Sequence, residues 1–566
     1  MAAPARRHRI QNPGMRNNAD RGTRADATLL VAVQAVAVGA FVGSLGFSSD
    51  DWWFLARMQA AANDGLFELY HAVQSPFHAM RPLFLWLLAL LFKLFGLHPL
   101  GYHLLNAVLL WAAALGLHAV ARRFLPRTHA LAVALVFLVL PEYGTVRYWM
   151  TATPLTLSLA LFTFSVLADL RAVEAAAEGP ARIRVGWKAL ALVALVAANL
   201  AYELFLPLAV LNVLLPEALL RRQASALRPA VAARAVSHAS TVAVVAALAA
   251  FKWATTVRLG SFDLPERLDG FGELLAVSAR IAVFDYGLGL PKRVARLAVP
   301  GSAEMPAVGA LAAGLLVGAS LYRTAVCRGP HATDRAAALR LIVAGVLVFA
   351  LGYAIFLTNA NAQATPTGIG NRIAMASSLG TAMALVGSID LSTGWMRPPR
   401  RRALAFASLV GAVCACCVFV VQGLARYWTE APRAQERIVQ AIQQRWPTLS
   451  PGTTLILDGS CPYLGPAIVF ESSWDLSHRL QIHYGDPSLG ADVASAHLAL
   501  EDVGLRTVLY GSIVARYPWS PSLIVFDLRD GAAVVLANRE AASRYFAAHP
   551  RPACPPGVEG HGTPVF

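Results

Sequence analysis

Residues 27–47 read ATLLVAVQAVAVGAFVGSLGF, an apolar run that is followed at once by Ser48-Ser-Asp-Asp51. A helix of about 20 apolar residues spans a bilayer, whereas the apolar region of a cleavable signal peptide is shorter. The run follows a polar, basic leader, residues 1–26, and we therefore predict a signal anchor. Two acidic residues directly after it must leave the hydrocarbon region, unless they are used there.

Comparable runs recur along the whole chain of 566 residues. Hydrophobic residues make up 57% of the sequence and charged residues 14%, with mean hydropathy +0.53, whereas a soluble protein carries about 25% charged residues. The apolar runs lie near 27–47, 82–97, 100–121, 130–141, 151–170, 186–202, 204–220, 235–257, 306–326, 339–358, 373–391 and 403–425. This pattern predicts a polytopic α-helical membrane protein.

The net charge of +15 comes largely from short basic clusters between these runs, such as those in 122–127 and 397–402. Such clusters are typical of cytoplasmic loops, so no nucleic-acid binding is expected. If segment 82–97 does not cross, every cluster becomes cytoplasmic. That segment is short, begins after Arg81 and contains Lys93. We predict eleven crossings plus this re-entrant or interfacial helix, with twelve crossings as the alternative.

This topology divides the chain into three parts. The basic leader, residues 1–26, is expected in the cytoplasm. Residues 27–425 form the membrane module, with external segments at 48–81 and 258–305. Within the second of these, residues 271–290 are expected to form an amphipathic helix on the membrane surface. The expected location is the inner (plasma) membrane of a bacterium.

Residues 426–566 differ in kind and predict a small extracytoplasmic α/β domain. A polar helix is expected at 431–446, a buried strand at 453–459 and a closing helix at 538–549. Residues 523–536 predict a hairpin that turns at Asp530-Gly531. Cys461 and Cys554 lie in this domain, and an external location permits a disulfide between them.

The richest chemistry lies just after the first apolar run, at Asp50 and Asp51. In one interpretation Asp50 caps a short interfacial helix, while Trp52 and Trp53 lie in the headgroup region. In the other, a carboxylate at the membrane surface is a general base or a metal ligand.

The same residues belong to a wider pattern. After the acidic pair come Arg81-Pro82-Leu83, which open the next run, and then Gly96 and Pro99-Leu-Gly-Tyr-His-Leu-Leu-Asn106. Over residues 27–210 this pattern resembles the GT-C glycosyltransferases, which include protein O-mannosyltransferases and bacterial enzymes that decorate lipid A. The C-terminal domain shows no such resemblance.

The resemblance implies a sugar donor linked to polyprenyl phosphate, which is met at the external membrane face. It also implies that a first-loop aspartate deprotonates or positions the acceptor, a glycan, a lipid or a protein. Carried over, Asp50 is the first candidate for this role and Asp51 the second, while Arg81 lies where the family keeps a basic residue near the lipid phosphate. The next external segment offers Glu142 and Arg147 but no Asp. This leaves open whether a divalent metal, Mg or Mn, binds Asp50 and Asp51.

Other polar residues at the external boundary extend this candidate site. Arg81, Arg147 and Arg372 are expected to converge on the donor phosphate, because guanidinium groups bind phosphate through two hydrogen bonds. The alternative for each is a snorkelling side chain or a surface ion pair. Glu203, in an apolar setting, is a further catalytic candidate that lines the cavity, or else it belongs to a turn exposed to water. Glu142, Tyr148, Trp149 and Asn371 are candidates for substrate binding. Tyr148 and Trp149 stack on a sugar or belong to the interfacial aromatic belt; Asn371 and Arg372 hold a phosphate or simply end a turn.

The predicted function is therefore an integral-membrane glycosyltransferase. No Walker motif and no large cytoplasmic region is found, so a nucleotide-sugar donor is not expected. Two alternatives stay open from the sequence: a transporter or flippase of lipid-linked sugars, and a catalytically inactive scaffold of envelope assembly.

Overall fold

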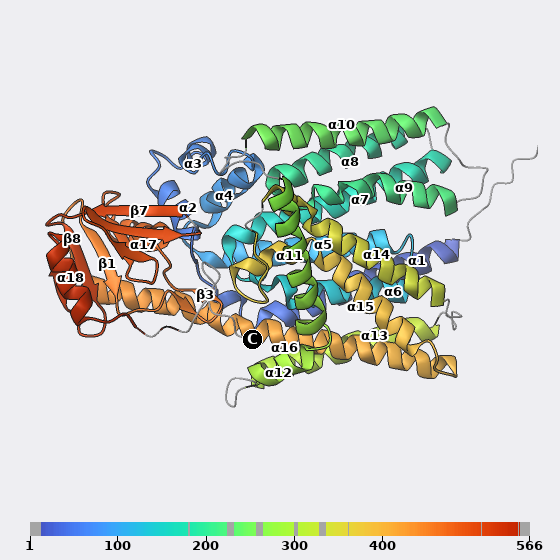
Figure 1. The fold of residues 1–566 in the computed structure, drawn as a ribbon. Coiled ribbons are helices and arrows are strands. Elements are labelled where there is room, and N and C mark those ends of the chain that lie inside the picture. The colour runs from blue at the N-terminus through green and yellow to red at the C-terminus, as the bar shows by residue number, and fades with distance from the viewer. Residues whose placement is uncertain are drawn as a thin grey trace, which may run out of the picture.

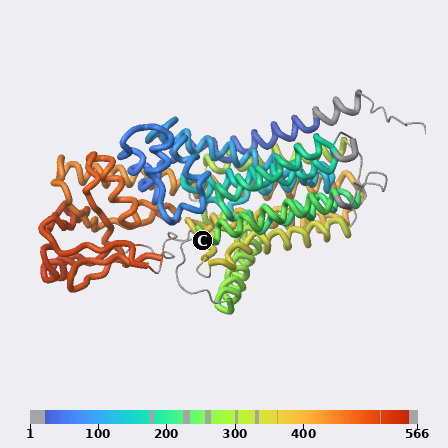
Figure 2. Tube along the Cα trace, turned by 90° about the horizontal axis from the view of Figure 1, so that it is seen from above, coloured from blue at the N-terminus to red at the C-terminus, as the bar shows by residue number. Residues whose placement is uncertain are grey.

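The computed structural model describes residues 13–178, 181–222, 231–255, 264–298, 304–327, 335–359, 362–510, 512–552 and 554. A long bundle of roughly parallel helices makes up most of the molecule, and a smaller domain of strands and helices lies at one end (Figure 1). Seen from above, the domain extends the long axis of the bundle (Figure 2). The expected division into a membrane module and a C-terminal α/β domain is present.

Among the described residues, eight helices are long and apolar enough to cross a membrane. They are α1 (Pro13–Gly39), α5 (Pro99–Ala121), α7 (Thr153–Glu178), α8 (Ala181–Ala201), α10 (Val231–Thr255), α13 (Glu304–Cys327), α14 (Arg335–Tyr353) and α16 (Pro399–Arg445). Three bent helix pairs raise the number to as many as eleven if each pair is one span. The chain is thus a multi-pass membrane protein.

Two of the bent pairs bring irregular backbone to the same end of the bundle as the domain. Helix α6 (Arg127–Val139) bends by 57° into the 3₁₀ helix η2 (Pro141–Arg147). The 3₁₀ helix η9 (Ile369–Met375) bends by 68° into α15 (Ser378–Thr393). Proline lacks a backbone N–H, so Pro141 ends the ladder of α6, and Gly368 precedes η9 with φ of 82°, a conformation that favours glycine.

One segment near the first loop is too short to cross, and a second predicted span is interrupted. Helix α4 (Pro82–Phe95) has 14 residues and is about 21 Å long, against a hydrocarbon core of about 30 Å. This length agrees with the predicted half-helix. Segment 204–220, expected to cross, is broken into the turns η4 (Glu203–Phe205) and η5 (Pro207–Val210) and the helix α9 (Leu211–Arg222). Pro207 interrupts the helical hydrogen bonds there. The segment still runs along the bundle, because Glu203 pairs with Lys252 near the end of α10, while Arg222 donates to the backbone oxygen of Phe124 at the opposite end.

The N-terminal leader is partly helical. Helix α1 begins at Pro13, inside the predicted leader of residues 1–26, while residues 1–12 lie outside the described part of the chain. Asp26 forms a buried ion pair with Arg127, so the leader's last residues are fastened to the base of α6.

The segment from Leu264 to Leu297 runs across the bundle, and we call it the interfacial segment. Helix α11 (Leu264–Arg280), a π-helical turn η7 (Ile281–Asp285) and helix α12 (Leu290–Leu297) follow one another with a bend of 70°. In Figure 1, α11 runs across the direction of α7, α8 and α10, and Figure 2 shows it projecting from the side of the bundle. The amphipathic helix expected at 271–290 is therefore longer at its start, and α12 was not expected.

The last span continues without a break into the C-terminal domain. The sequence predicted a span ending at 425 and a separate helix from 431, but α16 is one helix of 47 residues with Pro432 inside it. Its length of about 70 Å is more than twice the bilayer core. Gln422 donates to the backbone oxygen of Val36 at 2.7 Å, and Gln435 to that of Val469 at 2.8 Å. These contacts hold the helix to both parts of the molecule.

The C-terminal domain is built on a four-stranded sheet in the order β4-β1-β8-β9. Strands β4 (Gly490–Val493), β1 (Thr454–Asp458) and β8 (Leu523–Asp527) are parallel, and β9 (Ala533–Val535) is antiparallel to β8. The same domain contains the helices α17 (Ser473–Tyr484) and α18 (Arg539–Ala548). Smaller sheets are formed by β2 (Tyr463–Leu464) with β3 (Ala467–Ile468), and by β5 (Leu498–Leu500), β6 (Gly504–Leu509) and β7 (Ser512–Pro518).

Local sequence signals account for much of this domain. The hairpin of β8 and β9 turns through Gly531, whose φ of 73° favours glycine,. Asn538 caps α18 by accepting a hydrogen bond from the backbone N–H of Ala541 at 2.9 Å,. Cys461 and Cys554 are joined in a disulfide.

Candidate functional site

The first loop begins with two aspartates whose surroundings differ completely. Asp51 is the first residue of helix α2 (Asp51–Gln59) and is fully buried. Its carboxylate accepts hydrogen bonds from the backbone N–H of Ser48 at 2.9 Å and of Thr151 at 2.9 Å, and from the Thr151 hydroxyl. Both oxygens are therefore occupied, and Asp51 fastens the first loop to the start of α7.

Asp50 precedes α2 and makes no such bonds. Its Oδ1 is buried, and no hydrogen-bond partner for that atom is found among the described residues. Burial raises the pKa of Asp50 to about 6, although the guanidinium groups of Arg372 and Arg81 act to lower it. Burial, followed by the charge of Asp50, raises the pKa of Asp51 to about 8. Asp50 therefore has the lower pKa of the two aspartates.

The backbone around Asp50 is strained. Ser49 has φ of 54°, and the other non-glycine residue with positive φ in the described chain is Tyr510, also at 54°. A left-handed conformation is costly for a residue with a side chain, and such strain gathers at functional sites. The charges of Asp50 and Arg372 both act on the Tyr510 hydroxyl, so the two strained residues border one site.

Arg372 reaches this site from η9. Its guanidinium group lies 5.2 Å from the ring centroid of Trp149 and donates to the backbone oxygen of Ile369 at 3.0 Å. The Trp149 indole N–H donates to the backbone oxygen of Ser48 at 3.1 Å. Trp149 therefore links the turn before Asp50 to Arg372, and it holds the cation and the carboxylate on neighbouring segments.

Arg81 and Glu203 form the second charged group of the site. The Arg81 guanidinium makes a two-pronged ion pair with the Glu203 carboxylate and stacks 3.9 Å from the ring centroid of Tyr202. Lys252 lies 3.3 Å from the same carboxylate. Burial alone would raise the pKa of Glu203, but Arg81 and Lys252 outweigh it and lower the pKa to about 2. Glu203 is thus a permanent anion between two cations, a positioning residue rather than a base.

The C-terminal domain contributes residues that sequence reasoning missed. Glu471, at the junction of β3 and α17, is buried, and it accepts hydrogen bonds from the hydroxyls of Tyr463 and Tyr510. Burial raises its pKa to about 8, and Asp50 is among the charges that add to the shift. The sequence signal for Glu471 was an acidic residue within an apolar stretch. The neighbouring sequence gave no reason to place this residue near Asp50.

The domain is held against the first loop by direct contacts. The Arg479 guanidinium of α17 lies 5.0 Å from the ring centroid of Trp52 in α2. The α17 start is itself fixed by Asp475, which accepts from the backbone N–H groups of Glu471 at 2.7 Å and Ser472 at 3.1 Å. This capping box orients Glu471.

Four predicted site residues lie elsewhere. Arg147 is buried, donates to the backbone oxygen of Leu138 at 2.8 Å and lines a small internal cavity with Gln34 and His103. The predicted convergence of three arginines therefore reduces to Arg81 and Arg372, both of whose charges act on Asp50.

The other three displaced residues are structural braces. Glu142 is buried and accepts from the hydroxyls of Ser378 and Thr381, each at 3.3 Å. The Tyr148 hydroxyl donates to the backbone oxygen of Val421 at 2.6 Å. Asn371 accepts from the backbone N–H of Thr145 at 3.1 Å. These contacts join η2 to η9, α15 and α16, and they support η9, the segment that carries Arg372.

The residues at Asp50 do not fit a divalent metal. Magnesium takes six oxygen ligands, with at least one or two carboxylates from the protein. Both oxygens of Asp51 are occupied, and the charges of Arg372 and Arg81 already act on Asp50. We therefore derive no step through a metal at this pair.

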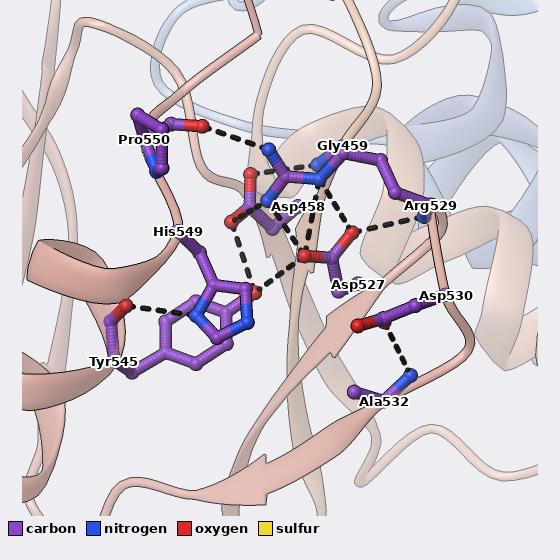
Figure 3. Close-up of polar contacts among 9 residues, drawn as sticks. All are labelled: Asp458, Gly459, Asp527, Arg529, Asp530, Ala532, Tyr545, His549 and Pro550. Carbon is purple, nitrogen blue, oxygen red and sulfur yellow. Dashed lines mark hydrogen bonds and ion pairs between the residues drawn. The ribbon is translucent and has the colours of Figure 1, made fainter.

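One acidic cluster with a histidine does occur in the C-terminal domain, at Asp527, Asp530 and His549. Figure 3 shows the Arg529 guanidinium between the carboxylates of Asp458 and Asp527, at 3.2 and 2.6 Å. The Tyr545 hydroxyl donates to the same two carboxylates. The cluster is thus a satisfied ion-pair network at the carboxyl ends of β1 and β8.

The arrangement around Asp50 can perform acid–base chemistry next to an anion. An ionised carboxylate with an unpartnered oxygen, Asp50, lies beside the cation Arg372 and the Arg81–Glu203–Lys252 group. The carboxyl group of Glu471, with a pKa of about 8, keeps its proton at neutral pH. Pairs of carboxyl groups with separated pKa values are typical of sites that move protons.

Fold and site together define a multi-pass α-helical membrane protein whose α/β C-terminal domain completes a polar site at one end of the bundle. No protein-family model and no curated protein matches the chain. Among solved structures it is similar to ArnT from Cupriavidus metallidurans. The match to ArnT bound to undecaprenyl phosphate has 15% identity and TM-score 0.34, and covers 81% of this chain and 84% of that one. The match to the apo state has 12% identity and TM-score 0.39, and covers 83% and 85%.

The archaeal oligosaccharyltransferase AglB from Archaeoglobus fulgidus, solved with an inhibitory peptide and a dolichol-phosphate, is also similar. Identity is 12% and TM-score 0.36, over 81% of this chain and 63% of that one.

Proposed function

We propose that this protein is an integral-membrane glycosyltransferase that moves a sugar from a polyprenyl-phosphate donor to an acceptor at the external membrane face. The observation that carries the proposal is Asp50, which lies directly after the first span with a buried, unpartnered oxygen. Its pKa of about 6 suits a general base at neutral pH,. Two guanidinium groups beside it supply cations for a phosphate.

The reaction follows from these roles. Asp50 takes the proton of the acceptor hydroxyl as the acceptor oxygen forms a bond to the anomeric carbon of the sugar. The bond between that carbon and the donor phosphate oxygen breaks, and polyprenyl phosphate leaves with the electron pair. Arg372 stabilises the negative charge that develops on the phosphate, and Arg81, held by Glu203, adds to the positive potential.

The proposal includes a topology. The N-terminus lies in the cytoplasm, while the first loop and the C-terminal domain lie outside the inner membrane of a bacterium. The basic clusters then lie on the cytoplasmic side. The acceptor approaches between the first loop and the C-terminal domain, where Asp50 and Glu471 meet.

Purified full-length protein in liposomes tests the proposal. It is given a panel of polyprenyl-phosphate hexoses and pentoses with an envelope extract as acceptor, and released polyprenyl phosphate is measured by mass spectrometry. We expect release from at least one donor, and a loss of about 10²–10⁴-fold in Asp50→Asn. The control is Asp64→Asn, which alters an exposed aspartate of the same loop. Equal release by Asp50→Asn and wild type would exclude Asp50 as the base, and no release from any donor would refute the activity.

A further inference from the structure

A basic pocket opens on the interfacial segment, formed where α11, η7 and α12 meet. It has a volume of about 400 Å³ and is lined by Arg280, Lys292, Arg293, Arg296 and the carboxylate of Asp285. Pockets of roughly 300–1,000 Å³ hold small ligands or headgroups. Four cations therefore face one carboxylate in a single hollow.

The positive charge of the residues that line this pocket exceeds their negative charge. Arg293 is buried and forms an ion pair with Asp285. Arg280, Lys292 and Arg296 are exposed, and no ion pair of theirs is found in the described ranges. Lys292 and Arg296 are four residues apart on α12, so they lie on one face of the helix and repel each other. An anion between them would remove this repulsion.

The helix orientation explains why these side chains point outward. Leu290, Arg293 and Leu297 form the buried face of α12, and Leu297 contacts Gly423 of α16. Lys292 and Arg296 lie beside this buried face and are exposed. Lys292 also lies in the first turn of the helix, where the helix dipole disfavours a cation and favours an anion.

Phe284 lines the same pocket, and a second large apolar side chain, Leu288, follows it in the chain. Phe284 and Leu288 are 61% and 79% exposed, and both belong to the turn that carries Asp285. Exposed apolar side chains next to cations are typical of segments that lie in the headgroup region of a bilayer. Tyr286 anchors the segment to the rest of the protein. Its side chain is buried, and its hydroxyl donates to the backbone oxygen of Pro366.

We propose that this pocket binds the phosphate headgroup of an anionic membrane lipid, with Phe284 and Leu288 inserted beside its acyl chains. Lipid is the one source of phosphate that also covers exposed apolar side chains. The site is separate from Asp50 and does not depend on the proposed transfer activity. It would hold the interfacial segment at a fixed depth on the membrane.

Native mass spectrometry of the full-length protein in detergent tests the proposal with phosphatidylglycerol, phosphatidylcholine and inorganic phosphate as probes. We expect phosphatidylglycerol to bind in preference to phosphatidylcholine. The variant Lys292→Gln/Arg296→Gln should lose about tenfold or more in phosphatidylglycerol affinity, because each basic residue contributes to binding of an anionic surface. The swap Lys292→Arg/Arg296→Lys should bind as wild type, which separates charge from folding.

The matched control is Arg433→Gln/Arg437→Gln, which removes two exposed cations from α16 and should leave lipid binding unchanged. The proposal is overturned if both double neutralisations act alike, or if the two lipids bind equally. Binding of inorganic phosphate alone, lost in Lys292→Gln/Arg296→Gln without any lipid preference, would reassign the pocket to a soluble anion. Asp50→Asn should keep full phosphatidylglycerol binding, so failure of one proposal leaves the other intact.

Discussion

At the residue scale, two adjacent aspartates have different tasks. Neighbouring positions at the start of a helix point about 100° apart. The Asp51 carboxylate accepts from the backbone N–H groups of Ser48 and Thr151. The Asp50 carboxylate instead interacts with the charges of Arg372 and Arg81. Of two adjacent residues, Asp51 therefore fastens the loop, and Asp50 keeps an oxygen that is free to react.

The pH dependence of transfer follows from Asp50. Its pKa is raised to about 6 by burial, and the base must be deprotonated to accept a proton. The kcat/KM for transfer should therefore be constant above about pH 7 and fall on acidification, by about fivefold between pH 6 and pH 5. A profile measured with saturating acceptor checks this. An acid limb near pH 4, the range of an ordinary aspartate, would contradict a buried base.

The stability of the loop should depend on Asp51 rather than Asp50. Asp51→Asn places an amide group against N–H donors that now bond to a carboxylate, at a cost of about 1–3 kcal/mol. Asp50→Asn removes no hydrogen bond of the described structure. Thermal unfolding of the two variants in the same detergent should show a lower Tm for Asp51→Asn only. A lower Tm for Asp50→Asn would mean that its carboxylate is also structural.

Arg372 should not tolerate lysine. Lysine cannot reproduce a two-pronged bond to phosphate or stacking on Trp149. We expect Arg372→Lys to lower kcat/KM for the donor by roughly fivefold to 150-fold, the equivalent of about 1–3 kcal/mol. Arg437→Lys, on an exposed face of α16, is the control. Equal kinetics in both variants would remove Arg372 from the donor site.

At the scale of elements, α16 joins the two halves of the molecule. A Cβ at Gly46 would lie 2.6 Å from side-chain atoms of Pro432, whereas a Cβ at Gly43 meets nothing within 4 Å. The turn that leads to Asp50 therefore packs directly on the helix that carries the C-terminal domain. The proline ring, tolerated at some expense inside a helix, forms this contact.

Gly46→Ala should accordingly destabilise the protein while Gly43→Ala should not. Overpacking of a close contact typically costs about 1–3 kcal/mol. Unfolding midpoints of the two variants measure the difference. If Gly43→Ala and Gly46→Ala unfold alike, the close approach of the turn to α16 is not required.

At the scale of the whole molecule, the proposed topology places the first loop outside. Ser49 was a natural choice for labelling from the sequence, but the structure buries it, while Gln74 is exposed. In a Cys327→Ser background, Gln74→Cys should react with an impermeant thiol reagent in intact cells. Arg400→Cys, in the first turn of α16, should react only after permeabilisation. The reverse pattern would invert the topology.

The sequence by itself determined the membrane class, most of the helices that cross, the short α4, and the hairpin and closing helix of the C-terminal domain. These features depend on local apolar runs, turn residues and caps, which act within one segment. It also singled out Asp50, Arg81, Glu203 and Arg372. It could not determine that α16 is continuous, because Pro432 is a helix breaker by local rules and only packing on Gly46 accommodates it.

Only the tertiary structure decided how the site is composed. It separated Asp50 from Asp51, paired Glu203 with Arg81, moved Arg147 into the helical core and brought Glu471 to the first loop. Each of these outcomes depends on contacts between segments far apart in the chain, such as that of Asp51 with Thr151. The charge state of a carboxylate depends on the groups packed around it, and a linear pattern does not contain those neighbours.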